Sequence, residues 1–588
     1  MVTETAPSLP YHEPGIVTIL IQTSFLLLLN VLNAALDRVV YCGLLGQVLI
    51  GIAWGTPGAE WLSKSAQEVI VQLGYIGLLL LVYEGGLSTS FKSLKANLPL
   101  SSAVALTGIA LPIALSFSLQ AIVGATPLQA FAAGAALCST SLGTTFTVLN
   151  SSGLSASRLG VVLTSAAMMD DVVGLVMVQV ISNLGGGDLG VVTVVRPILV
   201  SLAFAVVVPL ICQFLVKPAT LFLNRHREAH PSGVPSRILS SRHTAFTLHT
   251  LLLVGLVAAA TYAGTSNLFA AYIAGASISW WDLEVSHPDN HHISDHTQAA
   301  IPEQDRPKST TNKDTAVSGT ANSKNQNVSR PESASNSTMP APNAESTTST
   351  ALLSYNKGTS GSSIYEHYYH QAVSRILQPF FFASIGFSIP ITRMFNGNIV
   401  WRGIVYTILM TSGKLVCGLW LVRIAKIPDL RFLRSLIKTK LPTMPHIWGR
   451  GARKGRQGEA RNHHGGQEPV ALSESSSRSA PHMQTPPAPK PFSIHPPLIL
   501  ALAMTARGEI GFLISAVAES KGIFASANDS SEGESDLFLI VTWAIVLCTT
   551  IGPFGVGLCA RRVKNLEAKK NKQQEGAGRD VLGPWGVN

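Results

Sequence analysis

Charged residues are scarce in this sequence. They make up 13% of its 588 residues, whereas soluble domains carry about 25%. Hydrophobic residues make up 47%, and they gather in long runs instead of recurring at the spacing of a soluble core. Together these features exclude a soluble enzyme. We therefore predict an all-α polytopic membrane protein and expect no enzymatic activity.

Cysteine is also sparse, and its six positions follow no metal-ligand or disulfide pattern. We expect neither a metal site nor a cofactor. The formal net charge of +10 would suit nucleic acid, but most basic residues stand in a few loops between the apolar runs. That distribution is typical of membrane topology, so we expect the lipid bilayer, and no nucleic acid, as a partner.

Long apolar runs define the expected spans. A helix needs about 20 mostly apolar residues to cross a bilayer, and by that criterion we expect about thirteen spans. They are Ile16–Leu36, Val39–Trp54, Val69–Val82, Leu98–Val123, Leu128–Leu149, Leu159–Ile181, Val191–Val216, Thr244–Ala263, Leu268–Trp281, Ala372–Ile391, Ile399–Ile424, Pro496–Ala518 and Leu537–Ala560.

The basic residues fall on alternate loops. One side receives Arg38, Lys92, Lys95, Arg158, Arg225, Arg227, Arg237, Arg242, Arg450, Arg453, Lys454, Arg456, Arg561, Arg562 and Lys564. The segment before the first span has no lysine or arginine. The positive-inside rule therefore predicts an N-terminus outside or in a lumen and a cytosolic C-terminus, in a plasma membrane or an endomembrane. An odd number of spans requires the same arrangement.

Two long hydrophilic insertions interrupt the apolar runs. Residues 283–364 are rich in Ser, Thr, Asn and Pro, and residues 442–494 in Arg, His, Ser and Pro. Segments of such composition bury too little apolar surface to fold alone, so we expect both to be disordered and cytosolic. Residues 1–282, 365–441 and 495–562 then form the transmembrane part, and 563–588 a short cytosolic tail.

Few ionisable residues lie deep in a span, where each costs about 2.5–3.5 kcal/mol on insertion scales. They are Asp170 and Asp171 in the sixth span, Lys414 in the eleventh, and Arg507 with Glu509 in the twelfth. Adjacent residues on a helix point about 100° apart, so the two aspartates face different surroundings. Pairing of Lys414 with one aspartate would leave the other carboxylate for a proton or a hard cation.

Two spans contain polar interruptions. The fifth holds the hydroxyl-rich run Cys138-Ser139-Thr140-Ser141, and the twelfth holds Thr505-Ala506-Arg507-Gly508-Glu509. Interrupted helices in separate halves of a chain indicate a transporter site near the middle of the membrane. Close packing of small residues explains the glycines equally well, but it does not explain Arg507 and Glu509.

With these residues assembled, the sequence resembles the monovalent cation:proton antiporter superfamily, in the branch of sodium/proton and potassium-efflux antiporters. The resemblance covers roughly residues 15–282 and 366–562. It is carried, in order, by Tyr83-Glu84-Gly85-Gly86-Leu87, Ser139-Thr140-Ser141, Asp170-Asp171, the Phe380–Gly386 run, Gly413-Lys414 and Arg507-Gly508-Glu509.

The resemblance implies a fold of thirteen helices built from two inverted five-helix repeats. It also implies a homodimer with a dimerisation domain and a mobile core, in which two discontinuous helices cross. Arg507 and Glu509 would support that crossing. Potassium-efflux relatives often carry a C-terminal nucleotide-binding domain; no Gly-x-Gly-x-x-Gly follows Ala560, so we expect no regulation of that kind here.

The resemblance also implies residue roles. Asp171 matches the ion-binding aspartate, and Asp170 the partner of the lysine matched by Lys414. Thr140 and Ser141 match the unwound segment beside the ion. The implied activity is exchange of Na⁺ or K⁺ for protons by alternating access, with cation and proton competing for Asp171.

Other functions stay open. A potassium/proton exchanger of an organelle and a non-transporting ion or pH sensor fit the same residues. A channel is disfavoured because no repeated filter of backbone carbonyls is evident. An intramembrane aspartyl protease is disfavoured because it needs aspartates on two helices, whereas Asp170 and Asp171 are adjacent.

Overall fold

The computed structural model describes residues 11–229, 241–284, 360–422, 494–525 and 535–573, together with Leu582 and Trp585. Within those ranges it leaves out residues 12, 90, 142, 144–148, 150–152, 156 and 187–189. All regular secondary structure in the described residues is helical. The helices are α1 (Ile16–Val40), α2 (Leu44–Trp54), α3 (Lys64–Leu87), α4 (Phe91–Ser116), α5 (Leu119–Val123), α6 (Pro127–Ala136), α8 (Arg158–Leu184), α9 (Val191–Ile211), η1 (Cys212–Val216), α10 (Lys217–Ala229), α12 (Arg242–Ala263), α13 (Asn267–Glu284), α16 (Gly361–Tyr368), α17 (His370–Ala372), η3 (Val373–Leu377), α18 (Gln378–Phe387), α19 (Ile391–Met394), α20 (Gly397–Leu415), η4 (Val416–Leu421), α22 (His495–Ala503), α23 (Glu509–Ser520) and α24 (Asp536–Gln573).

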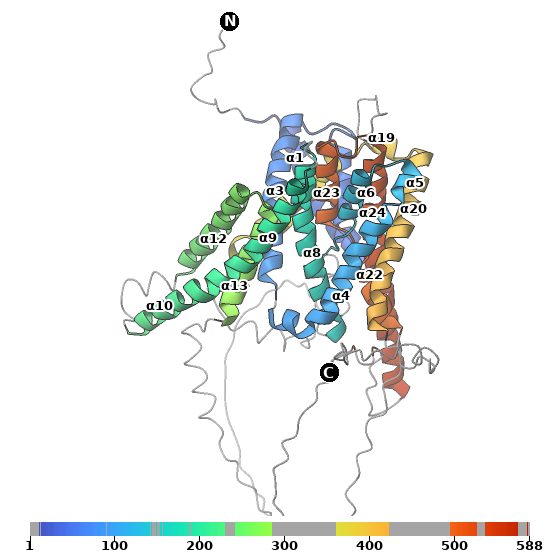
Figure 1. Ribbon diagram of the computed structural model, residues 1–588. Coiled ribbons are helices and arrows are strands. Elements are labelled where there is room, and N and C mark those ends of the chain that lie inside the picture. The colour runs from blue at the N-terminus through green and yellow to red at the C-terminus, as the bar shows by residue number, and fades with distance from the viewer. Residues whose placement is uncertain are drawn as a thin grey trace, which may run out of the picture.

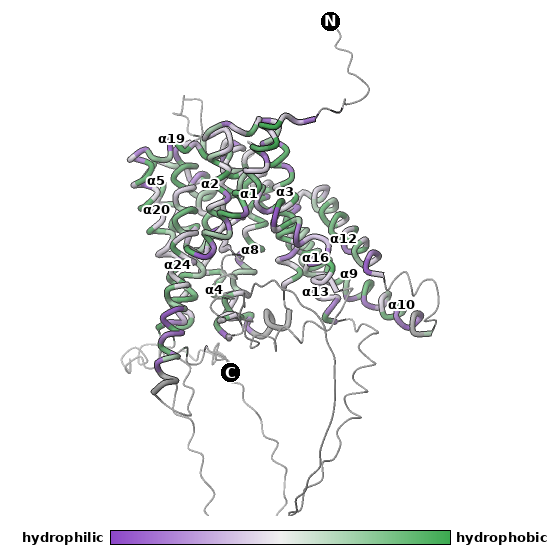
Figure 2. The backbone as a smooth tube through the Cα atoms, turned by 180° about the vertical axis from the view of Figure 1, so that it is seen from behind, coloured by the Kyte–Doolittle hydropathy of each residue, from purple (hydrophilic) through white to green (hydrophobic). Residues whose placement is uncertain are grey.

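Eight stretches of helix in the described residues are long and apolar enough to cross a membrane, which confirms the prediction of an all-α polytopic protein. They are Ile16–Val39, Lys64–Leu87, Asn97–Val123, Arg158–Leu184, Val192–His226, Arg242–Ala263, Gly397–Leu421 and Asp536–Lys569. The number of thirteen spans stays a prediction. Figure 2 shows hydrophobic residues along the bundle and hydrophilic ones gathered toward the end where α10 and the C-terminal part of α24 lie.

The break between α1 and α2 comes later in the chain than hydropathy predicted. Hydropathy placed the second span at Val39, but α1 continues to Val40 and α2 begins only at Leu44. The turn between them has Tyr41 in a left-handed conformation, and the Asp37 carboxylate accepts a hydrogen bond from the Gly43 amide at 2.6 Å. The side chain that fixes the turn lies in the Asp37-Arg38 gap between the two expected spans, but α1 continues through that gap and the turn itself forms four residues later.

Two helices are discontinuous, as the polar interruptions predicted. The first is α6, which begins with a capping box between Thr126 and Gln129 and has a proline at its first helical position. It ends at Ala136. A non-helical segment follows as far as Ser141. The other, α22, ends at Ala503 and is separated by five residues from α23, which begins at Glu509.

The helices pack in two groups, which Figure 1 shows side by side. Helices α2, α3, α13 and α18 pack on one another and form what we call the scaffold group. Helices α4, α6, α8, α20, α22, α23 and α24 form the crossing group, with α8 against α4 and α23. Helix α9 contacts both α8 and α13 and so joins the groups.

Most of the two predicted insertions, residues 285–359 of the first and 442–493 of the second, lies outside the described residues, as do residues 423–441 of the predicted transmembrane part. Their disorder and cytosolic location stay predictions. Helix α16 begins at Gly361, within the last residues of the first insertion, where the Ser360 side chain accepts a hydrogen bond from the Ser363 amide. At the other end of the chain, α24 continues beyond the expected span to Gln573.

Candidate functional site

The two unwound segments touch at their midpoints. The Ser141 amide donates to the Ala506 carbonyl oxygen at 3.0 Å, so each segment satisfies backbone groups that its own helix does not. Gly508 allows the close approach, because a Cβ atom there would lie 2.6 Å from the Ser141 Cβ. The crossing is therefore held by backbone contacts at a position where a side chain does not fit.

Two buried cations satisfy the carbonyl groups that follow α6. The Lys414 ammonium donates to the Cys138 carbonyl oxygen at 2.6 Å, and Arg507 Nη1 donates to that of Ser139 at 2.7 Å. Both side chains are fully buried. The C-terminal ends of α6 and α22 both meet the crossing, and a helix C-terminus carries partial negative charge. Positive charge at this point is therefore electrostatically favoured.

Asp170 forms a buried ion pair. Its Oδ2 atom lies 2.7 Å from Lys414 Nζ, and neither side chain is exposed. The Thr140 hydroxyl donates to the same oxygen at 2.5 Å and lies 3.0 Å from the Lys414 ammonium. One of the two adjacent aspartates is thus neutralised by a lysine from α20 and a hydroxyl from the first unwound segment.

Asp171 points elsewhere. It is only partly buried, and it lines a cavity of about 640 Å³ together with Ser141 and Glu509. The two aspartates therefore occupy the different surroundings expected from their offset around α8. Carboxylate and hydroxyl oxygens facing one cavity are the ligands that hard cations prefer.

Glu509, for which the resemblance implies a supporting role, lines the same cavity as Asp171. It is the first residue of α23, where a helix N-terminus favours a negative charge. The Ser141 hydroxyl is 3.4 Å from its Oε2 atom. Glu509 and Asp171 both line the cavity, so two carboxylates border it at the crossing, whereas Asp170 is held by Lys414.

The outer part of the cavity is lined by residues that the sequence did not single out as a site. Asp37, Glu84 and His370 line it at the ends of α1, α3 and the start of α17. The His370 ring lies 4.0 Å from a Glu84 carboxylate oxygen and 3.7 Å from one of Glu366. Glu84 belongs to the Tyr83–Leu87 element that carries part of the family resemblance, whereas His370 belongs to none of the motifs that the sequence analysis identified.

The structure thus gathers all seven residues that the sequence indicated around one crossing. Six of them are linked by the contacts above, and Asp171 reaches the same place through the cavity. The four side chains of Thr140, Asp170, Lys414 and Arg507 are inaccessible to solvent. Access to the site therefore lies on the side of Asp171, Ser141 and Glu509.

Comparison with known proteins gives a consistent result. Residues 25–299 match the family "Sodium/hydrogen exchanger, transmembrane". The chain is 33% identical over 163 residues to the high-affinity Na⁺/H⁺ antiporter NhaS3 of Synechocystis, a match covering 27% of this chain and 35% of that protein. It is 31% identical over 152 residues to the Na⁺/H⁺-K⁺ antiporter GerN of Bacillus cereus, covering 26% of this chain and 39% of that protein.

A third relative, the probable Na⁺/H⁺ antiporter GerT of Bacillus cereus, is 34% identical over 178 residues, covering 29% of this chain and 47% of its own. The matches thus span between a third and a half of these relatives. The solved structure of the sodium proton antiporter MjNhaP1 from Methanocaldococcus jannaschii at pH 8 aligns with 95% of this chain and 98% of its own. Its TM-score of 0.43 and 11% identity are too low to identify the fold.

The family match covers the Tyr83–Leu87 element, the first unwound segment and both aspartates. The match supports, for residues 25–299, the resemblance to the monovalent cation:proton antiporter superfamily that the sequence motifs indicated.

Proposed function

We propose that the protein is a secondary active transporter that exchanges Na⁺ or K⁺ for protons across a membrane by alternating access. The observation that carries the proposal is the separation of the two aspartates. Asp170 is paired with Lys414 at 2.7 Å, whereas Asp171 faces a cavity whose lining, among the residues that the structure describes, includes no lysine or arginine. A carboxylate in that position takes either a proton or a cation, but not both.

Competition at Asp171 accounts for coupling. When the carboxyl group is protonated it offers no charge to a cation, and when it is ionised it attracts one. The Ser141 hydroxyl and the Glu509 carboxylate border the same cavity and supply further oxygen ligands. Asp170 stays paired in this scheme, with Thr140 and Lys414 fixing the unwound segment beside the ion.

Alternating access is supported by the division into two helix groups. Asp171, Ser141 and Glu509 belong to the crossing group, and Asp37 and Glu84 lie on α1 and on the scaffold helix α3. The cavity runs between them toward the end of the bundle that receives Arg38 and Lys92. By the positive-inside rule we assign that end to the cytosol, with the N-terminus outside or luminal. A movement of the crossing group against the scaffold would expose Asp171 to the other side.

The relatives guide the choice of ions. The names of NhaS3 and GerT specify Na⁺ and H⁺, and that of GerN adds K⁺. Both monovalent cations therefore belong in the test, and an organellar potassium/proton exchanger is included in the proposal. A homodimer, as the resemblance implies, is proposed on that ground alone.

The test is transport in proteoliposomes that contain a pH indicator. We expect addition of Na⁺ or K⁺ to drive proton movement, and Asp171→Asn to abolish it. The matched control is Glu84→Gln, which removes another carboxylate of the same cavity, near the end of α3. It should retain at least about a fifth of the activity, since the loss of one charge at the mouth of the cavity is worth about 1 kcal/mol or less.

Three results would contradict the proposal. Unchanged transport in Asp171→Asn would remove Asp171 from the mechanism. Cation movement without proton movement would indicate a channel. Absence of any ion movement in folded wild-type protein would favour the sensor on the same fold.

A further inference from the structure

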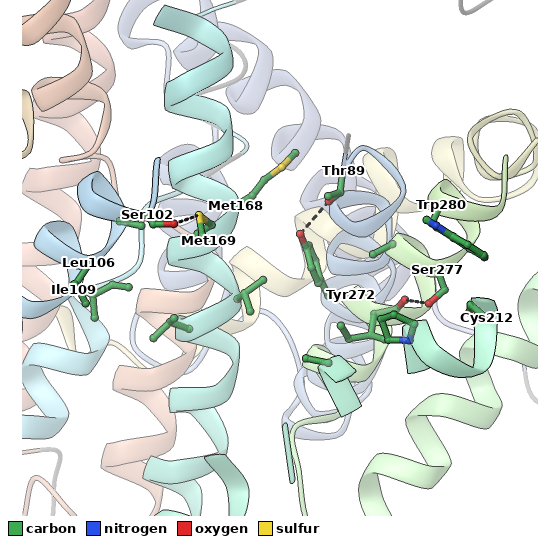
Figure 3. A pocket seen from close by; sticks show the side chains of 17 residues that line it. Thr89, Ser102, Leu106, Ile109, Met168, Met169, Cys212, Tyr272, Ser277 and Trp280 are labelled. Carbon is green, nitrogen blue, oxygen red and sulfur yellow. Dashed lines mark hydrogen bonds between the residues drawn. The ribbon is translucent and has the colours of Figure 1, made fainter. Parts of the chain in front are cut away.

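A second cavity lies beside the site, on the other side of α8. It has a volume of about 570 Å³, within the range of about 300–1,000 Å³ typical of ligand pockets. Helices α4 and α8 form one wall, and α9 and α13 the other. Figure 3 shows Leu106 and Ile109 on one side, Met168 and Met169 in the middle, and Trp280 with Cys212 opposite.

The hydroxyl groups that line this cavity already have partners inside the protein. The Ser102 hydroxyl contacts the Met169 sulfur at 3.8 Å, and the Ser277 hydroxyl donates to the Ile273 carbonyl oxygen at 2.7 Å. The Tyr272 and Thr89 hydroxyls are hydrogen-bonded to each other at 3.0 Å (Figure 3). An apolar occupant therefore leaves none of these hydroxyls unsatisfied, whereas an ion would find no charged partner among the lining residues.

The mouth of the cavity faces the hydrocarbon of the bilayer. Leu106 at its rim is 68% exposed. Along α9, which contributes Ala205 and Pro209 to the lining, Leu202 and Val206 are exposed apolar side chains. The cavity is therefore continuous with a surface that meets lipid chains in a membrane protein. Among the lining residues, Ile109, Met169 and Pro209 lie near the middle of their spans, at the depth of acyl chains rather than of headgroups.

Helix α9 is irregular where it borders the cavity. Pro209 lies inside the helix, and a π-helical turn, Cys212–Val216, follows directly. Proline removes a backbone hydrogen bond, and both features bend helices. Figure 1 shows α9 and α10 running obliquely away from α8. Pro209 and Cys212 both line the cavity, so the irregular part of this helix forms part of its wall.

We propose that an acyl chain of a bilayer lipid occupies this cavity, between the crossing group and the scaffold group. This lipid site is separate from the cavity that contains Asp171, and its occupation does not depend on ion exchange. Met168 and Tyr272 line both cavities, so the bound chain lies one side chain away from the cavity that contains Asp171. Movement of α8 against α13 changes the shape of the acyl-chain site.

The first test uses Trp280 fluorescence in vesicles of phosphatidylcholine brominated in the middle of its acyl chains. The Trp280 signal is obtained as the difference between the wild type and Trp280→Phe. We expect brominated lipid to quench this signal. Ala205→Phe, which fills the mouth, should reduce the quenching at least twofold, and the matched control Ala203→Phe, exposed on α9 but outside the lining, should leave it unchanged.

Quenching of Trp280 by aqueous iodide but not by brominated lipid would overturn the proposal, since the cavity would then contain water. Equal quenching in Ala205→Phe and Ala203→Phe would also overturn it, because Trp280 would then meet lipid by another route. Neither readout requires transport, so failure here is distinguishable from failure of the proposed function.

The second test needs no variant. A phosphatidylcholine with a photoactivatable diazirine in its acyl chain is reconstituted with wild-type protein, and the labelled residues are identified by mass spectrometry. We expect label on Met168, which is only 7% exposed and is reached through the cavity. Label confined to outward side chains such as Leu202, with none on Met168, would refute an inserted chain.

Discussion

The buried pair of Asp170 and Lys414 permits a quantitative test of the crossing. Lys414 is fully buried and makes three short contacts, to the Asp170 carboxylate, the Cys138 carbonyl oxygen and the Thr140 hydroxyl. Lys414→Met keeps most of the side-chain volume and removes the charge. Asp170 would then be a buried carboxylate with one hydroxyl partner, and Cys138 would keep only a 3.5 Å contact from Arg507.

Removing one partner of a buried ion pair costs about 3–5 kcal/mol, because the other charge is left without compensation. We expect Lys414→Met and Asp170→Asn each to destabilise the protein by that amount. The double variant leaves no buried charge from the pair, so the two effects should not add, with a coupling energy of about 2–3 kcal/mol. The matched control is Lys217→Met, which breaks a 2.9 Å pair with Glu284 at the surface and should cost at most about 1 kcal/mol.

The assay is reversible unfolding of purified protein in mixed micelles with increasing sodium dodecyl sulfate, followed by circular dichroism. A cost for Lys414→Met no larger than that for Lys217→Met would refute the buried pair. Additivity of the Lys414→Met and Asp170→Asn effects would refute the contact between them. Both results are independent of whether the protein transports ions.

Three further variants test the rest of the crossing. Arg507→Met leaves the Ser139 carbonyl oxygen without its 2.7 Å donor and should destabilise by about 1–3 kcal/mol in the same unfolding assay; an unchanged stability would show that this contact is dispensable. Glu509→Gln should raise the cation concentration for half-maximal transport about fivefold, since one nearby charge in a water-filled cavity is worth about 1 kcal/mol, and Glu284→Gln, at the surface, should leave it unchanged. An equal effect of the two substitutions would contradict a local role for Glu509. Gly508→Ala places a Cβ atom 2.6 Å from another Cβ and should cost about 1–3 kcal/mol, whereas wild-type stability would mean that the unwound segments are farther apart.

Sequence reasoning identified the membrane class and the polar residues of the site because both depend on composition along a helix. A charge inside an apolar run is visible without a structure, and this is how Asp170, Asp171 and Lys414 were singled out. Whether Asp170 or Asp171 pairs with Lys414 depends on how α20 and the first unwound segment pack against α8. The resemblance indicated that assignment, and periodicity alone did not.

Other parts of the site left no trace in the sequence. The partners of Lys414 and Arg507 include backbone carbonyl groups of Cys138 and Ser139, and backbone groups are the same at every residue. Hydropathy divided the first two spans at Asp37 and Arg38, but α1 continues to Val40 and Asp37 accepts its hydrogen bond from Gly43, so the start of α2 was placed too early. His370 reaches the cavity only because α17 packs next to the end of α3.

The apolar cavity illustrates a further limit. Its residues are ordinary core and lipid-facing side chains, and none of them marks a pocket on its own. The cavity lies between helices that are far apart in the sequence, and its wall includes Pro209 and Cys212 at the irregular part of α9. Helix irregularities of this kind depend on tertiary packing and are not fixed by the local sequence alone.

Competition between cation and proton at Asp171 is the central claim, and proton release on cation binding tests it most directly. Purified protein in weakly buffered nanodiscs is titrated with Na⁺ and with K⁺ while the pH is recorded. We expect at least one cation to release protons from the wild type and none to do so from Asp171→Asn, with Glu84→Gln behaving like the wild type. Cation binding to the wild type without proton release, or equal release from Asp171→Asn, would contradict the mechanism.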